Sequence, residues 1–380
     1  YLELNNLLKI PPLSLYIHYP WCLKKCPYCD FNSHEGEIQS DYISALIKDL
    51  DGDLQYVQNR AIESIFIGGG TPSLMNTEDA RYLLNGLKER LNFSDNVEIT
   101  MEVNPGTFEA EKFTEFRSMG INRLSVGVQS FEDSQLKFLG RVHSSNEAVN
   151  AIIEAQRAGF TNINIDLMYG LNGQSVEMCI EDLNKAIELS PAHISFYQLT
   201  LEPNTLFSKF PPRLPSDEII WEMGEKGAKL LNKNGFRQYE VSAYSSNPSL
   251  HNLNYWTFGD YIGIGAGAHG KITDMSSHQI FRTLKSKSPN EYLLSIQQNK
   301  MISRKKVVDG LSFEFMLNSL RLIDGFDSGL FESRTGLSIE SVRSQIKEAE
   351  KLNLLDIRDN WIKPTKNGYS FLNELQEIFL

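Results

Sequence analysis

Three cysteines stand close together near the start of the chain, in the stretch SLYIHYPWCLKKCPYCDFNSH. Cys22, Cys26 and Cys29 follow a C-x-x-x-C-x-x-C spacing, and a loop of this length can bring three thiolates around one face of an iron–sulfur cubane. In a four-iron cluster the fourth iron is then open to a small molecule that carries an amino and a carboxylate group. The methionine end of S-adenosylmethionine (SAM) carries both, and an electron from a reduced cluster can break a carbon–sulfur bond of its sulfonium.

Other uses of these cysteines have to be weighed. A disulfide framework is disfavoured, because three clustered cysteines and one distant cysteine in a long chain without a recognisable secretion signal indicate a reducing compartment. A zinc site completed by His18 or His34 stays open, since zinc and iron–sulfur clusters can share this ligand spacing. The fourth cysteine, Cys179, lies in a helical stretch, where we expect a small buried apolar residue.

A run of glycines follows the second predicted strand. Gly68, Gly69 and Gly70, with Thr71 and Pro72, come directly after it. Glycines let a ligand approach the backbone closely, so exposed amides and carbonyls there can grip the methionine end of SAM. Taken alone, the run also fits a tight turn from strand to helix. Its place after the cysteine loop, within the same α/β unit, favours SAM.

The composition is that of a globular protein with a sizeable core. Of the 380 residues, 41% are apolar and 22% are charged, and 48 acidic against 37 basic side chains give a net charge of -11. This length fits two domains, or one barrel with a small appended domain. An acidic chain without a basic stripe argues against a nucleic-acid partner, and no apolar run is long enough to span a bilayer. We therefore expect a cytoplasmic protein.

Strands and helices alternate over the first half of the chain. Ser40 is a plausible N-cap for the first helix, and Ser144 with Glu147 forms a capping box for another. This order predicts an α/β fold with a parallel sheet, and six strands in place of eight predict an open, TIM-like partial barrel with its active site at the carboxyl ends of the strands. The strands are expected in SLYIHY and at residues 64–67, 98–103, 123–128, 162–167 and 193–198. The helices are expected at residues 41–58, 78–91, 109–119, 175–189 and 217–234.

Beyond residue 198 this alternation lapses. We expect residues 1–200 to form the barrel core and residues 201–300 an extension that carries the segments HNLNYW and GIGAGAHG. Residues 301–380 read as helices followed by two short strands and a final helix, which is the order of a small winged-helix-like domain. Because that domain has no basic face, we expect packing or partner contact from it and not DNA binding.

Polar residues fall at the ends of successive predicted strands: Glu102, Gln129, Asp166 and Gln198. On a parallel barrel these ends share one cleft, so residues that are scattered in the sequence converge there. Arg141, in LGRVH, would supply a bidentate partner for a carboxylate. A polar network with a purely structural role at the mouth of the barrel is the alternative interpretation.

The cysteine spacing, with the aromatic Tyr28 just before the third cysteine, resembles the signature of the radical SAM superfamily. The whole chain, from YIHYPWC through GGGTPSL, GVQSF, NIDLMYGL and HNLNYW to the C-terminal helices, looks like the oxygen-independent coproporphyrinogen III oxidase-like family. The resemblance implies a [4Fe-4S] cluster on Cys22, Cys26 and Cys29, and an electron donor for it. It also implies SAM contacts at Tyr16, Gly69, Gly70, Thr71, Glu102, Gln129, Arg141 and Asp166.

The resemblance further implies a role for each polar contact. Arg141 would take the methionine carboxylate of SAM, Gln129 and Asp166 the ribose hydroxyls, and Glu102 the ribose or the amino end.

The segment HNLNYW suits an iron porphyrin. His251 can serve as an axial imidazole ligand, and the rings of Tyr255 and Trp256 can cover the macrocycle. A lone histidine is more often a hydrogen-bonded structural residue. In the family that this chain resembles, however, the segment is a signature of heme chaperones, which implies heme binding at His251.

Two functions follow from the resemblance. The oxidase is an enzyme whose adenosyl radical leads to decarboxylation of porphyrin propionates, whereas the chaperone carries heme to apoproteins of the respiratory chain. The oxidase pattern has a further cysteine two positions after the third, where this chain has Phe31, and it has a longer N-terminal arm. The chaperone is therefore expected, without coproporphyrinogen III dehydrogenase activity, and the oxidase is the alternative. The sequence leaves open whether SAM is cleaved, whether the chain is a monomer or a homodimer, and whether it touches a membrane peripherally.

Overall fold

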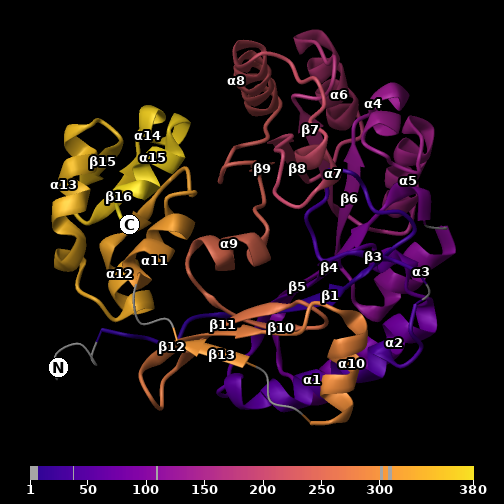
Figure 1. Ribbon diagram of the computed structural model, residues 1–380, viewed down its shortest axis with the longest axis horizontal. Coiled ribbons are helices and arrows are strands. Elements are labelled where there is room, and N and C mark those ends of the chain that lie inside the picture. Colours follow the sequence, from indigo (N-terminus) through magenta and orange to yellow (C-terminus); the bar gives the residue numbers. More distant parts are fainter. Residues whose placement is uncertain (1–6, 37, 108–109, 300–302, 307–309) are drawn as a thin grey trace.

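The computed structural model describes residues 7–36, 38–107, 110–299, 303–306 and 310–380. Its centre is a parallel sheet, and all six predicted strands are confirmed as consecutive neighbours in it (Figure 1). Their order along the sheet is the order along the chain, as a TIM-like partial barrel requires. They are β1 Leu13–Tyr19, β4 Ile62–Gly69, β5 Phe93–Val103, β6 Arg123–Gln129, β7 Asn162–Tyr169 and β8 His193–Gln198.

The number of strands in the sheet was predicted wrongly. In the described residues the sheet has 11 strands, because β10 pairs in parallel with β1 and the flanking strands pair antiparallel at both edges. These strands escaped prediction because the glycine-rich segment that holds β10 and β11 looks like a loop, and the others are short or polar. They are β9 Ala243–Ser245, β10 Asp260–Ile264, β11 His269–Asp274, β12 Gln279–Leu284 and β13 Ser303–Lys306.

Helices follow most strands of the parallel sheet. The capping box of Ser144 and Glu147 is confirmed, but Asp41 occupies the N-cap position predicted for Ser40 and makes no side-chain cap bond. Cys179 is buried in α6, as predicted. The helices are α1 Tyr42–Asp53, α2 Thr77–Arg90, α3 Ala110–Met119, α4 Asp133–Phe138, α5 Ser145–Arg157, α6 Val176–Glu188, α7 Leu206–Lys209, α8 Asp217–Lys233 and α10 Pro289–Gln297. The strands β2 Trp21–Cys22 and β3 His34–Glu35 and the 3-10 turns η2 Leu54–Tyr56, η3 Pro72–Leu74 and η4 Pro105–Thr107 lie in the loops.

The two faces of the parallel sheet differ in polarity. On β1, Leu13, Leu15 and Ile17 belong to the main apolar core beneath the helices, while Ser14 bonds to Ser64 of β4 on the opposite face. Successive side chains of a strand point to opposite faces, so the second set lines the interior of the barrel. That interior set is polar and largely buried: Ser14, Ser64, Glu98, Thr100, Arg123, Ser125, Asn164 and His193.

A short helix, α9 Leu250–Trp256, lies against the strands β4 and β1 and carries the HNLNYW segment. Its N-terminus is held by the buried carboxylate of Glu98. The carboxylate accepts bonds from the hydroxyl of Ser249 at 2.9 Å and from the amides of Leu250 at 3.1 Å and His251 at 3.2 Å. A negative charge at a helix N-terminus satisfies amides that have no partner inside the helix.

The C-terminal residues have their own apolar core, around Phe315, Phe326 and Phe331. The predicted order of two helices, two short strands and a helical end is present, but a strand and a further helix that were not predicted lie between the two helices. The helix α9 lies between this unit and the sheet (Figure 1). The predicted domain boundaries at residues 200 and 300 stay a prediction. The elements are α11 Leu311–Ser319, β14 Phe326–Asp327, α12 Ser328–Thr335, η5 Ile339–Val342, α13 Arg343–Lys351, β15 Leu355–Arg358, β16 Trp361–Pro364, α14 Lys366–Ser370 and α15 Leu372–Glu377.

No helix in the described part of the chain is long and apolar enough to cross a membrane.

The buried ion pair between Lys285 and two aspartates gives a test of the fold. The ammonium group of Lys285 lies 2.5 Å from Asp49 and 2.7 Å from Asp53. These two contacts join the end of β12 to α1. In Lys285→Met, two buried carboxylates lose their cation, so urea unfolding should show a loss of about 3–5 kcal/mol. The exposed pair of Lys226 and Glu222 is the control, and Lys226→Met should leave the unfolding curve unchanged. Equal curves for the two variants would contradict this account of the core.

Candidate functional site

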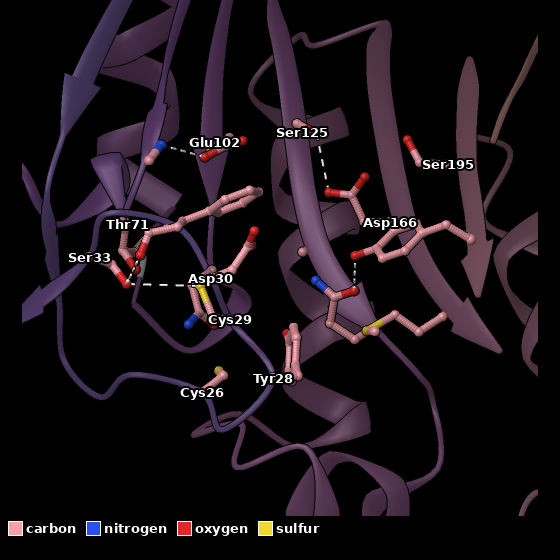
Figure 2. Close-up of a pocket in the computed structure, with 18 of the residues that line it drawn as sticks. Cys26, Tyr28, Cys29, Asp30, Ser33, Thr71, Glu102, Ser125, Asp166 and Ser195 are labelled. Carbon is pink, nitrogen blue, oxygen red and sulfur yellow. Dashed lines mark hydrogen bonds between the residues drawn. The ribbon is translucent and has the colours of Figure 1, made fainter. Parts of the chain in front are cut away.

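A cavity of about 570 Å³ opens at the carboxyl ends of the parallel strands. The cysteine loop and the glycine run form one side of it, and the inward side chains of β5 to β8 form the other (Figure 2). Most of the predicted site residues line this cavity, although they come from segments far apart in the sequence. They are Cys22, Cys26, Cys29, Gly69, Gly70, Thr71, Glu102, Gln129, Arg141, Asp166 and Gln198.

The three loop cysteines face this one cavity, and each is half-buried. Hydroxyl groups lie near two of the three sulfurs: that of Thr71 is 3.6 Å from Cys22, and that of Ser33 is 3.9 Å from Cys29. Burial raises the pKa of the Cys22 and Cys29 thiols. A bound metal centre offsets that cost by stabilising the thiolates, so this set of donors suits a cluster held by three cysteines.

The two histidines that could have completed a zinc site are engaged elsewhere. The ring of His18 uses Nδ1 with the hydroxyl of Tyr16, at 2.9 Å, and Nε2 with the carbonyl of Asn32, at 2.8 Å. The Nε2 of His34 lies 3.2 Å from the Asn32 side chain. In the described ranges, no three histidine, cysteine, aspartate or glutamate side chains form a site for a single metal ion.

The glycine run is shaped by close packing against the cysteine loop. Gly69 has φ = 114°, a conformation that favours glycine, and a Cβ there would collide with the ring of His18. At Gly70 a Cβ would lie 2.5 Å from the carbonyl of Trp21. The amides of Gly70 and Thr71 donate to the carbonyls of Tyr19 and Trp21, each at 2.7 Å. The glycines therefore let the second strand end directly behind the cysteines.

Glu102 projects from β5 into the cavity, where one carboxylate oxygen accepts the amide of Gly69 at 2.9 Å (Figure 2). Burial, reinforced by the neighbouring charge of Asp166, raises the pKa of Glu102 to about 7. Its protonation state near neutral pH therefore depends on what else occupies the cavity.

Asp166, on β7, accepts bonds from Asn164 at 2.8 Å and from the hydroxyl of Ser125 at 3.3 Å. Burial raises its pKa as well. Gln129, at the end of β6, has φ = 72° and accepts the hydroxyl of Tyr197 at 2.7 Å. A positive φ in a residue other than glycine is uncommon and costs free energy, which marks this strand end as constrained.

Arg141 lies beside the cysteine loop. One of its amino groups donates to the carbonyl of Gly127 at 2.7 Å, and the other lies 3.6 Å from the sulfur of Cys26. Its Nε has no hydrogen-bond partner among the described residues. The guanidinium group is therefore fixed at the cavity wall by contacts of its two amino groups.

Two predicted residues are not part of the cavity lining: Tyr16, which bonds to His18 inside the barrel, and His251. His251 is 2% exposed, stacks on Phe66 and bonds through Nδ1 to Ser64 at 2.9 Å. Burial, aided by the charge of Arg123, lowers the pKa of His251 to about 3, so the ring is neutral at physiological pH.

The aromatic neighbours of His251 also have partners. The ring of Tyr255 packs edge-on against His251, and the guanidinium group of Arg321 lies 4.4 Å from the ring of Trp256. The two rings predicted to cover a macrocycle are thus half-buried and already in contact with other side chains.

Sequence reasoning missed the deeper part of the cavity. Its lining includes Arg123, Ser125, Asn164, Ser195 and Asn252. Four of these lie two, four or six residues before Gln129, Asp166 or Tyr197 on the same strand, and therefore on the same face. The signal was available in the period of two along each strand, which carries polar residues inward for several positions before the end.

Comparisons with known proteins agree with this architecture. Residues 16–186 match the radical SAM superfamily, and residues 311–371 match the HemN C-terminal domain. The chain is 48% identical to the heme chaperone HemW of Haemophilus influenzae, over 98% of this chain and 99% of that protein, and 47% identical to HemW of Escherichia coli, over 98% and 100%. The structure of the coproporphyrinogen III oxidase HemN from Escherichia coli superposes with a TM-score of 0.82 at 22% identity, covering 100% of this chain and 92% of that one, which shows a shared fold.

The raised pKa of Glu102 predicts a pH-dependent stability. Between about pH 4.5 and 7 the folded protein keeps a proton that the unfolded chain has released, so stability should fall as the pH rises through this window. Relative to Glu102→Gln, the free energy of unfolding of the wild type should fall by up to about 3 kcal/mol across this window. Water that enters the cavity and solvates the carboxylate would reduce this loss. Urea unfolding of both proteins from pH 4.5 to 8 measures this, and a constant difference would contradict it.

Proposed function

Because this chain belongs to the radical SAM superfamily and, within it, to the family of the heme chaperone HemW, we propose that it binds a [4Fe-4S] cluster, SAM and heme and delivers heme to respiratory apoproteins. The observation that carries the proposal is near-complete alignment at 42–48% identity with several proteins named as that chaperone. We further propose that the protein works in the cytoplasm and receives electrons from a separate donor.

In this proposal Cys22, Cys26 and Cys29 hold the cluster, which when reduced can supply an electron to the sulfonium of SAM. Cys179 takes no part, since it is buried in α6. The hydroxyl of Thr71 lies beside the first sulfur and the guanidinium group of Arg141 beside the second. Hydrogen bonds to cluster ligands are one way in which a protein sets a reduction potential.

SAM would lie along the wall formed by the glycine run and the ends of β5 to β7. The positive charge and the cavity position of Arg141 suit the methionine carboxylate, and Glu102, Gln129 and Asp166 face the same space with acceptor oxygens for amino and ribose groups. Tyr16 lies outside the lining, so its contribution would be to fix His18 behind Gly69.

Heme is the remaining ligand, and His251 its proposed axial ligand. A neutral imidazole is the form that binds iron, and Nε2 of His251 has no hydrogen-bond partner in the part of the chain that is described. Because the residue is 2% exposed, ligation requires α9 to move away from β4.

The coproporphyrinogen III oxidase is the second candidate, and the shared fold with HemN favours it. Phe31 argues against it by resemblance, because the oxidase pattern has a cysteine there. Phe31 is 58% exposed and lines the cavity, so an apolar ring occupies the mouth in place of a thiol.

We expect one oxygen-labile four-iron cluster per chain. After anaerobic reconstitution, Cys179→Ala should keep the iron and sulfide content and the visible spectrum of the wild type, whereas Cys26→Ala should lose the cluster, because only the three loop thiols meet at one cavity. Loss of the cluster in Cys179→Ala, or an intact cluster in Cys26→Ala, would refute the assignment of ligands.

We also expect the protein to bind heme and not to decarboxylate coproporphyrinogen III. Heme titration of the wild type should give a Soret band that shifts in His251→Ala, with the exposed His278→Ala as the control. Identical Soret spectra for wild type and His251→Ala would remove His251 as the axial ligand. Separately, reconstituted protein with SAM, a reductant and coproporphyrinogen III should yield no protoporphyrinogen, and multiple turnovers would restore the oxidase.

A further inference from the structure

The deep end of the cavity holds a buried cation without a counter-ion. Arg123, the first residue of β6, is 2% exposed and lines the cavity. Its Nε donates to no acceptor, and no carboxylate forms an ion pair with its guanidinium group in the described residues. A buried charge without a partner is costly, so this group is a candidate site for an anion that comes with a ligand.

The surrounding carboxylates have other partners. Asp166 senses the charge of Arg123, but its oxygens accept bonds from Asn164 and Ser125. Glu98, on the neighbouring strand, uses its carboxylate on Ser249 and on the first amides of α9. Neither side chain can turn to Arg123 without giving up bonds that it already makes.

The imidazoles beside Arg123 do not add to its charge. Burial, followed by the charge of Arg123, lowers the pKa of both His193 and His251, and both rings are therefore neutral at physiological pH. Neutral polar groups, among them Ser242 and Asn252, complete this deep end of the cavity, which we call the floor. The guanidinium group of Arg123 is thus the one cation among these groups, and it suits a monoanion such as a carboxylate.

The methionine carboxylate of SAM cannot be that anion. It would lie beside Arg141, whose guanidinium group bonds to the carbonyl of Gly127, and Arg123 is four residues earlier on the same strand. At about 3.3 Å per residue, roughly 13 Å of strand separates the two positions. The opposite end of SAM is a neutral adenine, so the cation at the floor needs a second ligand.

We propose that the guanidinium group of Arg123 binds a carboxylate of a ligand other than SAM. The planar fork of arginine matches a carboxylate in a bidentate arrangement. Two sources share this chemistry: a propionate arm of the porphyrin, which rests on the heme function proposed above, or a small free carboxylate, which does not.

The first arm of the test needs no heme. The melting temperature of the reconstituted protein with SAM is measured against propionate and against propionamide, which has the same shape without the charge. Propionate should raise it and propionamide should not. The rise should be lost in Arg123→Gln, kept in part in Arg123→Lys, and unchanged in Arg81→Gln, which alters an exposed arginine outside the cavity.

The second arm compares heme with heme dimethyl ester by Soret titration. The wild type should bind heme about tenfold or more tightly than the ester, and Arg123→Gln should bind the two equally. A response to propionate with equal affinity for heme and ester identifies a small free carboxylate as the ligand. A response to propionate without any heme binding keeps the floor site and refutes the heme function. No response to propionate together with equal affinity for heme and ester overturns the proposal.

Discussion

The polar interior of the barrel is the constraint on which the rest of the structure depends. A parallel sheet covered by helices on one face must satisfy every polar group that its strands turn toward the other. Here most inward residues do so through one another and through α9, whose N-terminus rests on the carboxylate of Glu98, whereas Thr100 and Arg123 each keep a buried polar atom without a partner among the described residues. The cavity begins where this satisfied network ends, above Arg123, and it reaches the cysteine loop at the opposite end of the strands.

Most of the parallel sheet and most of the cavity wall could be predicted from the sequence. Alternating strand and helix patterns fix the order of a parallel sheet, and parallel strands place their carboxyl ends together, so Glu102, Gln129 and Asp166 had to meet. The capping box at Ser144 is equally local, because its two side chains are three residues apart. Such features depend on neighbours in the chain or on a general rule of topology.

Features that depend on distant partners could not be read in the same way. The segment HNLNYW forms a helix because Glu98, far away in the sequence, accepts its first amides, and its residues show no strong helical period of their own. The strand β10 runs into the glycine-rich segment GIGAGAHG and becomes a strand because it pairs with β1. The burial of His251 follows from the formation of α9 on Glu98 and the pairing of β10 with β1. Its motif alone therefore suggested a heme ligand, whereas the fold places the ring against Ser64 and Phe66.

The burial of His251 sets an energetic condition on heme ligation by this residue. Moving α9 breaks the bond to Ser64 and the contacts with the carboxylate of Glu98, and bonds to a charged group are worth about 1.5–3 kcal/mol each. The sum is several kcal/mol, against about 8 kcal/mol for a micromolar complex. If heme uses His251, the cost of moving α9 therefore cancels a large part of the free energy of heme binding, unless α9 forms new bonds once it has moved. A ligand that enters the cavity from its open end reaches Arg123 with α9 in place, and such a ligand is free of this cost.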